Sequence, residues 1–262
     1  MSIRSSLAVL ALVGLPLLAC GGGAKEEAAP PPGPAATAAA PAASAGGGGA
    51  ATGTASVSGK ISFEGTAPAP EKIKTSADPK CQAMHPQGLE RQTVDASGGG
   101  LKDVLVYVKS GVSGTYPPPT EPVLLDQRGC MYHPHIITVQ AGQPLKIRNS
   151  DDTLHNIHPR PTVNQEFNIG QPRKDMESTK IFDKPEVPIP VGCDVHPWMR
   201  SYIAVLNHPF FAVTKEDGTY EIKGLPPGEY EIEAWHEKLK NQTQKVTVKD
   251  GEKAKADFTY KS

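Results

Sequence analysis

GTYEIKGLPPGEYEIEAWHE, residues 218–237, alternates apolar and charged side chains on both sides of a Pro-Pro-Gly turn. This is the pattern of two strands that each bury one face. Just upstream, Asp217-Gly218 forms a second turn signal. Similar short alternating stretches, separated by Gly, Pro and Asp or Asn clusters, recur from Val57 onward, and no helical periodicity exceeds two turns. The sequence therefore predicts an all-β protein of sandwich or barrel type.

The N-terminal part has a different composition. The apolar run over residues 7–19 is shorter than the roughly 20 residues that span a bilayer, so residues 1–20 are predicted to be a secretory signal peptide. Its Leu-Leu-Ala-Cys ending resembles the lipobox of bacterial lipoproteins, which implies that Cys20 is lipidated; an ordinary signal peptide with a chance cysteine is the alternative. Residues 21–55 are almost entirely Gly, Ala, Pro, Ser and Thr and predict a disordered linker.

These features indicate a location and a class of partner. A lipidated Cys20 implies a membrane anchor in the cell envelope, with the rest of the chain periplasmic or on the cell surface. Gly21 is not an Asp, which in some bacteria permits sorting to the outer membrane, so the outer membrane is favoured over the inner. The formal net charge of −1 gives no indication of a nucleic-acid partner.

The cysteine count becomes informative once export is assumed, because exported proteins can form disulfides. If Cys20 carries lipid, Cys81, Cys130 and Cys193 remain, an odd number. The sequence does not settle which two pair. Loop and strand-edge surroundings favour a Cys81–Cys130 disulfide, whereas Cys193 has a histidine and a methionine beside it and is predicted to be the functional thiol.

VGCDVHPWMR, residues 191–200, spaces Cys193, His196 and Met199 three residues apart. A short loop cannot surround an ion, so a further histidine is needed, and residues 149–158, NSDDTLHNIH, offer one. A thiolate, two imidazoles and a weak thioether suit a blue copper ion. Zinc gains little from a thioether, so the methionine favours copper.

Residues 120–207 resemble a cupredoxin of the amicyanin and plastocyanin group. CDVHPWMRSYIAV is similar to the ligand loop of amicyanin, and VQAGQPLKIRNSDDTLHNIH resembles the segment that carries the family's first ligand. The resemblance implies a Greek-key β-sandwich. Its implied copper ligands are His155, Cys193, His196 and Met199.

The same resemblance implies roles for neighbouring residues. Asn156 would join the two ligand loops by hydrogen bonds, and Asn149 would brace its own loop. His196 would reach the surface through an apolar patch of Pro197 and Trp198, where a redox partner exchanges electrons; a Trp198 packed in the core is the alternative.

CMYHPH, residues 130–135, permits two interpretations. Cys130, Met131, His133 and His135 could form a second copper-binding cluster. The favoured interpretation is a disulfide cysteine beside surface histidines.

Residues 208–262 resemble the carboxypeptidase-regulatory-like, prealbumin-like β-sandwich module, which is generally a structural or interaction unit. Such a module normally starts with a strand like SGKISFEG, which lies far upstream here. Residues 56–119 are therefore predicted to be an N-terminal β segment that can complete this sandwich, with residues 120–207 inserted. Two consecutive sandwiches or one merged assembly are the alternatives.

The predicted function is that of a type 1 copper protein that carries single electrons between redox proteins of the envelope and is not an enzyme. Two alternatives use the same residues differently. The first is a copper storage, delivery or resistance protein. The second is an envelope interaction protein with a vestigial metal site.

Overall fold

The computed structural model describes residues 53–262. The predicted signal peptide, Cys20 and the linker up to residue 52 lie outside the described residues. Ala55, the last residue assigned to that linker, is buried and begins the first strand. Within residues 53–262, no helix is long and apolar enough to cross a membrane. The elements are β1 (Ala55–Glu64), β2 (Glu71–Ile73), α1 (Pro79–Met84), β3 (Leu89–Arg91), β4 (Leu105–Ser110), β5 (Val123–Arg128), β6 (Met131–His133), β7 (Ile136–Gln140), β8 (Pro144–Asn149), β9 (His155–Pro159), β10 (Ile169–Gln171), β11 (Met176–Ile181), β12 (Glu186–Gly192), β13 (Arg200–Leu206), β14 (Phe211–Val213), β15 (Thr219–Leu225), β16 (Gly228–Trp235), β17 (Gln242–Val248), β18 (Lys253–Lys255) and β19 (Phe258–Lys261).

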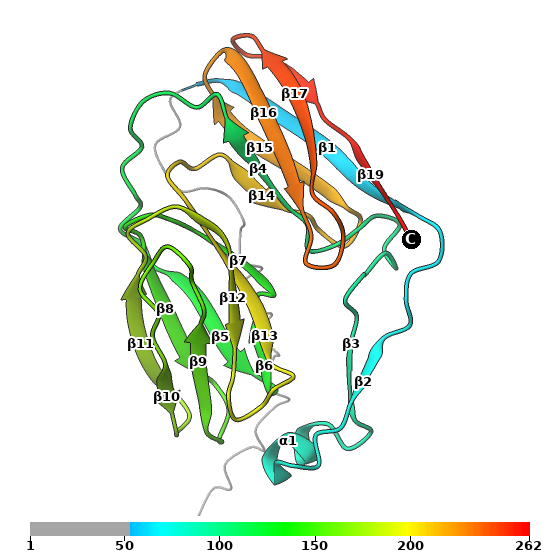
Figure 1. Ribbon diagram of the computed structural model, residues 1–262, viewed down its shortest axis with the longest axis vertical. Coiled ribbons are helices and arrows are strands. Elements are labelled where there is room, and N and C mark those ends of the chain that lie inside the picture. The colour runs from blue at the N-terminus through cyan, green and yellow to red at the C-terminus, as the bar shows by residue number, and fades with distance from the viewer. Residues whose placement is uncertain (1–52) are drawn as a thin grey trace, which may run out of the picture. The chain divides into compact units, whose positions relative to one another are not determined.

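Strands from the two ends of the described chain share one sandwich, which we call the outer sandwich (Figure 1). In its first sheet, β1 pairs antiparallel with β15 and in parallel with β18 and β19. The order of its second sheet is β14-β4-β16-β17. Because β1 and β4 precede residues 120–207 and β14–β19 follow them, the middle segment is inserted into the outer sandwich.

The inserted sandwich also has two sheets, with orders β10-β9-β12-β13-β7 and β11-β8-β5-β6. Parallel pairs, β7 with β13 and β5 with β8, connect strands that are distant in the chain. Two prolines in β12, Pro188 and Pro190, are typical of edge strands because they offer no N–H. Nevertheless β12 lies between β9 and β13, and its register shifts between Glu186 and Ile189.

Apolar side chains fill a separate core in each sandwich. A third buried cluster combines side chains from both sandwiches. It contains Leu105, Tyr107, Ile136, Ala204, Leu206, Phe211 and Trp235. The predicted Asp217-Gly218 turn lies between β14 and β15; Gly218 has φ +77°, and a Cβ there would lie 2.4 Å from the Ile61 carbonyl oxygen, so glycine is required.

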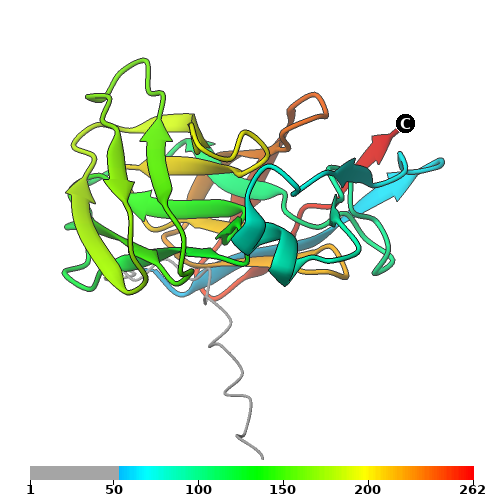
Figure 2. The same cartoon turned by 90° about the horizontal axis from the view of Figure 1, so that it is seen from below.

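A segment that we call the strap, residues 71–91, contains β2, α1 and β3 (Figure 2). Asp78 caps α1 by accepting hydrogen bonds from the N–H groups of Lys80 and Cys81, and Pro79 follows in the first turn. Cys81 is buried and forms a disulfide with Cys130, the pair that the sequence favoured, with Cα atoms 5.9 Å apart. Because Cys130 lies between β5 and β6, the disulfide ties the strap to the inserted sandwich.

Candidate metal centre

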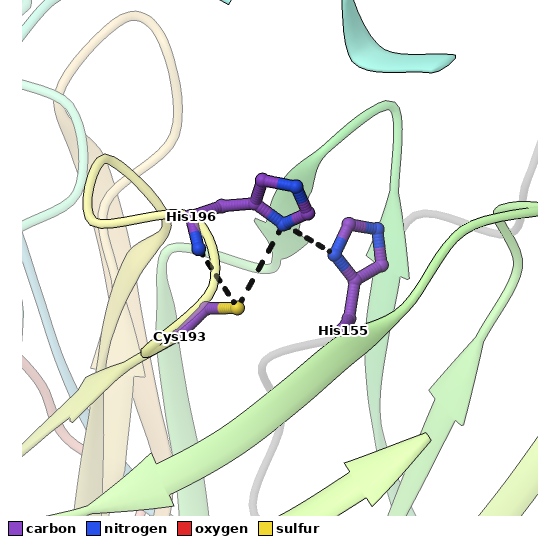
Figure 3. Close-up of side chains that lie close together, drawn as sticks. All are labelled: His155, Cys193 and His196. Atoms are coloured by element: carbon purple, nitrogen blue, oxygen red, sulfur yellow. Dashed lines mark hydrogen bonds between the residues drawn. The ribbon is translucent and has the colours of Figure 1, made fainter. Parts of the chain in front are cut away.

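Two loops at one end of the inserted sandwich bring three predicted ligands together (Figure 3). His155 begins β9, whereas Cys193 and His196 lie in the turn that joins β12 to β13. Along β12, Ile189, Val191 and Cys193 alternate onto the buried face, so the strand itself delivers the thiol to the interior. Backbone hydrogen bonds from Met199 N–H to the His196 carbonyl, 2.9 Å, and from Cys193 N–H to the Met199 carbonyl, 3.3 Å, close the turn.

The distances between the ligand atoms suit one metal ion. The Nδ1 atoms of His155 and His196 are 3.0 Å apart, and Cys193 Sγ is 3.8 Å from His196 Nδ1. An ion with metal–nitrogen bonds of about 2.0 Å and a metal–sulfur bond of about 2.3 Å separates such atoms by about 3.3 and 3.5 Å at tetrahedral angles. Side chains can therefore hold an ion here with only small adjustments.

A carboxylate holds the outer nitrogen of each imidazole. His155 Nε2 lies 2.9 Å from Asp151 Oδ2, and His196 Nε2 lies 3.1 Å from Asp78 Oδ2. Because an ionised carboxylate only accepts, each Nε2 carries a proton. A neutral ring then presents a lone pair on Nδ1, whereas a protonated ring donates from Nδ1. When both rings are neutral, their Nδ1 lone pairs are 3.0 Å apart and repel each other, and either a proton or a metal ion between them removes this repulsion. The pair of carboxylates thus orients the rings for metal binding.

Both carboxyl groups are held in the ionised form. Burial raises the pKa of Asp151. Hydrogen bonds from His155 and from the N–H groups of Cys130 and Gly129 lower it by more, so the net shift of this pKa is downward. Asp78 behaves similarly. Burial raises its pKa, and hydrogen bonds from the Cys81 N–H, His196 and others outweigh this, which leaves the pKa at about 2.

The Cys193 thiol lies in surroundings that favour the thiolate. Burial raises its pKa, yet hydrogen bonds with His155 and His196 and with the backbone N–H groups of Asn156 and His196 lower it to about 6. The His196 N–H is 3.4 Å from the sulfur. A deprotonated thiol is the form that binds a metal.

The two predicted supporting asparagines occupy connected positions. Asn156 Oδ1 accepts hydrogen bonds from the Asp194 N–H, 2.7 Å, and from the Cys193 thiol, 3.2 Å, so it joins β9 to the cysteine loop. Asn149 is fully buried and its Nδ2 donates to the carbonyl oxygens of Thr153 and Gln171, both at 2.8 Å. Its Oδ1 also accepts from the Asp151 N–H, 2.9 Å, which braces the loop that carries the carboxylate.

Met199, the predicted fourth ligand, lies in the same turn as Cys193 and His196. Its side chain is fully buried within the core of the inserted sandwich. Met199 is thus part of the packed core beneath the turn, and its role as a fourth ligand stays a prediction.

One expectation about the centre is corrected. His196 was expected to reach the surface, but it is only 1 % exposed. The strap covers it, because its Nε2 contacts Asp78 Oδ2 at 3.1 Å and Cys81 Sγ at 3.6 Å. A contact between residues 118 positions apart could not be inferred from the ligand loop alone.

Pro197 and Trp198, the predicted patch, have different environments. Pro197 is exposed and lines a surface groove of about 470 Å³ together with Cys193, Arg160 and Arg200. Trp198 is half-buried: its Nε1 donates to the Cys130 carbonyl at 3.1 Å, and its ring centroid lies 5.0 Å from that of His196. Of these two residues, Pro197 presents an exposed surface next to the centre, while Trp198 packs between the imidazole and the disulfide loop.

The alternative copper cluster at residues 130–135 is not brought together. Cys130 is in the disulfide, His133 is exposed with its ring near the Arg128 carbonyl, and His135 Nε2 lies 2.6 Å from Glu237. Among the described residues, the metal-compatible groups that contain Cys130 involve Asp151 and His155 instead.

Sequence reasoning missed both carboxylates. Asp78 could have been noticed as a helix cap, since Asp-Pro is a common helix start. Asp151 lies four residues before His155, but nothing in NSDD distinguishes one acidic residue from its neighbour. Asp152 instead pairs with Lys80 at the surface.

Comparison with known proteins identifies relatives of parts of the chain. Residues 202–261 match the carboxypeptidase regulatory-like domain, a match that begins within β13 and extends into β19. None of the curated proteins matches the chain.

Solved structures similar to this chain include copper proteins. Amicyanin from Paracoccus versutus is 20 % identical, with a TM-score of 0.30, over 38 % of this chain and 96 % of that protein. A purple cupredoxin from Nitrosopumilus maritimus is 17 % identical, with a TM-score of 0.28, over 32 % of this chain and 97 % of that protein. A copper-containing nitrite reductase from Thermus scotoductus SA-01 is 19 % identical, with a TM-score of 0.29, over 37 % of this chain and only 25 % of that protein. At such scores the metal and the function must be inferred from the site itself.

Proposed function

We propose that this protein is a type 1 copper protein that carries single electrons at the cell envelope. The supporting observation is the pair of facing Nδ1 atoms, 3.0 Å apart, whose rings are each held by a carboxylate through Nε2. Cys193 completes three strong ligands, and Met199 offers a weak fourth. One thiolate, two imidazoles and a thioether are the donors that copper prefers over zinc.

The residues around the centre hold its geometry rigid. His155 and His196 are buried at 0 and 1 % exposure, and Asn156 ties their loops together. Bound copper supplies reversible one-electron transfer. Rigid ligands keep the change of geometry between its two oxidation states small, which speeds that transfer, and in this proposal no substrate bond is formed or broken.

The proposal extends to the chain's location and partners. A lipidated Cys20 anchors the protein in the envelope, in the outer membrane rather than the inner. Its partners are redox proteins of the envelope, and the groove lined by Pro197 and Cys193 is the open approach to the centre. The outer sandwich then serves as a structural support for the inserted one.

Addition of Cu(II) to the metal-free protein tests this proposal. We expect one equivalent to produce the intense visible thiolate-to-copper charge-transfer band. Cys193→Ala removes the thiolate and is expected to abolish the band completely. His133→Ala is a matched control, because His133 is exposed and belongs to none of the metal-compatible groups of the described residues, and it should leave the band unchanged. A wild-type protein without the band, or a band that persists in Cys193→Ala, contradicts the proposal.

A second candidate, copper storage or delivery, is favoured by the covered imidazoles. Neither ring reaches the surface, which suits retention of an ion more than fast exchange of electrons. The two candidates differ in colour and kinetics. Fast, reversible reduction of a blue centre indicates an electron carrier, whereas a colourless Cu(I) complex that yields its metal to a chelator indicates storage or delivery.

A further inference from the structure

The Cys81–Cys130 disulfide lies against the outer edges of both imidazoles. Cys81 Sγ is 3.6 Å from His196 Nε2. Each sulfur belongs to a group of one cysteine, one carboxylate and one imidazole whose ligand atoms all lie within 4.8 Å of one another. The two groups are Asp78, Cys81 and His196, and Cys130, Asp151 and His155. The disulfide therefore joins two half-sites on the side of the rings that faces away from Cys193.

We propose that Cys81 and Cys130, once a dithiol has reduced their disulfide, bind a second, thiophilic metal ion, Cu(I), behind the two imidazoles. The dithiol gives two electrons and two protons, and becomes a disulfide itself. The bond between the two protein sulfurs breaks and two thiols form. Cu(I) then displaces the two thiol protons, and its oxidation state does not change. Soft thiolate ligands select Cu(I) over harder ions.

The backbone already places the two sulfurs at a suitable separation. The Cα atoms are 5.9 Å apart, and both side chains are fully buried. With metal–sulfur bonds of about 2.3 Å, an ion between two thiolates allows the sulfurs to lie up to about 4.6 Å apart. Rotation about the two Cα–Cβ bonds moves the two sulfurs apart, toward this separation.

The carboxylates of both half-sites already accept hydrogen bonds from backbone N–H groups. Asp78 accepts hydrogen bonds from the N–H groups of Lys80 and Cys81, at 2.8 and 2.9 Å. Asp151 accepts from the N–H groups of Gly129 and Cys130, both at 2.8 Å. These donors stabilise the two carboxylates in the ionised form, so the half-sites are anionic and favour a cation between the thiolates.

The strap permits a reductant to reach the buried sulfurs. Around α1, its noncovalent contacts with the inserted sandwich include Asp78 with His196 and Thr153, Lys80 with Asp152, and His85 with the Gly129 carbonyl. The Lys80–Asp152 pair is exposed, and such pairs stabilise little. A helix of six residues does not persist by itself, so local opening of α1 exposes the disulfide.

Cu(I) titration of the full chain, without oxygen and with bicinchoninate as competing chelator, tests this inference. The oxidised protein is expected to bind one Cu(I). The protein reduced with a phosphine, and then freed of it, is expected to bind two. The reduced Cys193→Ser variant is expected to bind one, which counts the second site separately from the first. Cys81→Ser/Cys130→Ser is the matched control and should bind one ion under both conditions.

Alkylation provides a test that needs no variant. In the reduced wild-type protein, the second equivalent of Cu(I) should protect Cys81 and Cys130 from iodoacetamide, as peptide mass spectrometry can show. Equal stoichiometry before and after reduction, alkylation that Cu(I) does not slow, or loss of the folded near-UV circular dichroism spectrum on reduction would each overturn the inference. Failure of the proposed electron-carrier function looks different, because it removes the ion from the oxidised protein and the visible band.

Discussion

The two imidazoles of the centre receive their carboxylates from different parts of the chain. Asp151 is buried, lies four residues before His155, and belongs to the inserted sandwich. Asp78 is 118 residues from His196, its side chain is 18 % exposed, and it belongs to the strap. The carboxylate–imidazole contact of His155 is therefore part of the buried core. The equivalent contact of His196 is made by the strap, which lies over the centre from outside the inserted sandwich.

Because Asp151 is part of the core and Asp78 is part of the strap, loss of Asp151 should have the largest effect on the free energy of unfolding. Asp151→Ala leaves the N–H groups of Gly129 and Cys130 and the His155 ring without their acceptor. Each buried donor left without an acceptor costs about 1–3 kcal/mol, so the three together should cost about 3 kcal/mol or more. Urea unfolding of the metal-free protein measures it, and a loss below about 1 kcal/mol would show that water replaces the carboxylate.

Asp151→Asn sharpens the same point. An amide oxygen in the Oδ1 position can still accept from the Gly129 N–H, but the NH₂ then takes the Oδ2 position, where the Cys130 N–H loses its acceptor and His155 Nε2 faces a donor. The NH₂ favours the other tautomer of His155, with the proton on Nδ1. Copper affinity should then fall by at least the 10–100-fold typical of lost outer partners, while the loss of stability, about 1–3 kcal/mol for the unpaired Cys130 N–H, should be smaller than for Asp151→Ala. Chelator competition measures the affinity.

Asp78→Ala should be milder in stability than Asp151→Ala. It removes a helix cap, which costs about 1 kcal/mol, and the partner of His196, which lowers metal affinity about 10–100-fold. Asp152→Ala, which alters only the neighbouring surface ion pair, is the matched control and should change neither property. If Asp78→Ala unfolds the protein as strongly as Asp151→Ala, the strap is part of the core and not a cover.

The smallest effect is expected at a carboxylate without an imidazole. Burial raises the pKa of Glu186, but hydrogen bonds from the N–H groups and side chains of Thr162 and Asn164 outweigh this and lower it to about 2 from an ordinary 4.5. The carboxyl of Glu186 binds its proton less tightly in the folded protein than in the unfolded chain. Its contribution to the stability of the fold is therefore complete above pH 4.5 and is lost as the pH falls to about 2.

Glu186→Gln is therefore expected to cost about 1 kcal/mol at pH 7, nothing near pH 2, and no copper affinity. Urea unfolding at both pH values, together with chelator competition at pH 7, measures this. A change in copper affinity would mean that the centre senses general loosening of the inserted sandwich, which would weaken the contrast between Asp151 and Asp78.

Local sequence patterns predicted the strands and identified three side chains that the structure brings together, His155, Cys193 and His196, because alternation and ligand spacing are local properties. Ile189, Val191 and Cys193 share a buried face because strand residues alternate. The contacts of the strap were missed for the opposite reason. Asp78 meets His196 only after α1, the disulfide loop and the β12–β13 turn have been assembled. The spacing of residues along the chain does not predict this contact. The prediction that His196 reaches the surface was wrong for this reason.

The connectivity of the two sandwiches shows the same limit. β1 pairs with β15, β18 and β19 from the other end of the chain, so the sequence could offer insertion only as one of several arrangements. The partner strands of β1 could each be recognised as strands from the sequence. Their register with β1 depends on the assembly of both sheets of the outer sandwich.

X-ray absorption at the copper edge of the fully loaded protein tests the central claim most directly. One ion between His155 Nδ1 and His196 Nδ1 should show two nitrogen neighbours at about 2.0 Å and one sulfur at about 2.3 Å, and Cys193→Ser should remove that sulfur. A spectrum of the oxidised wild-type protein without a short sulfur contribution, or one that keeps it in Cys193→Ser, would contradict the assignment of this centre.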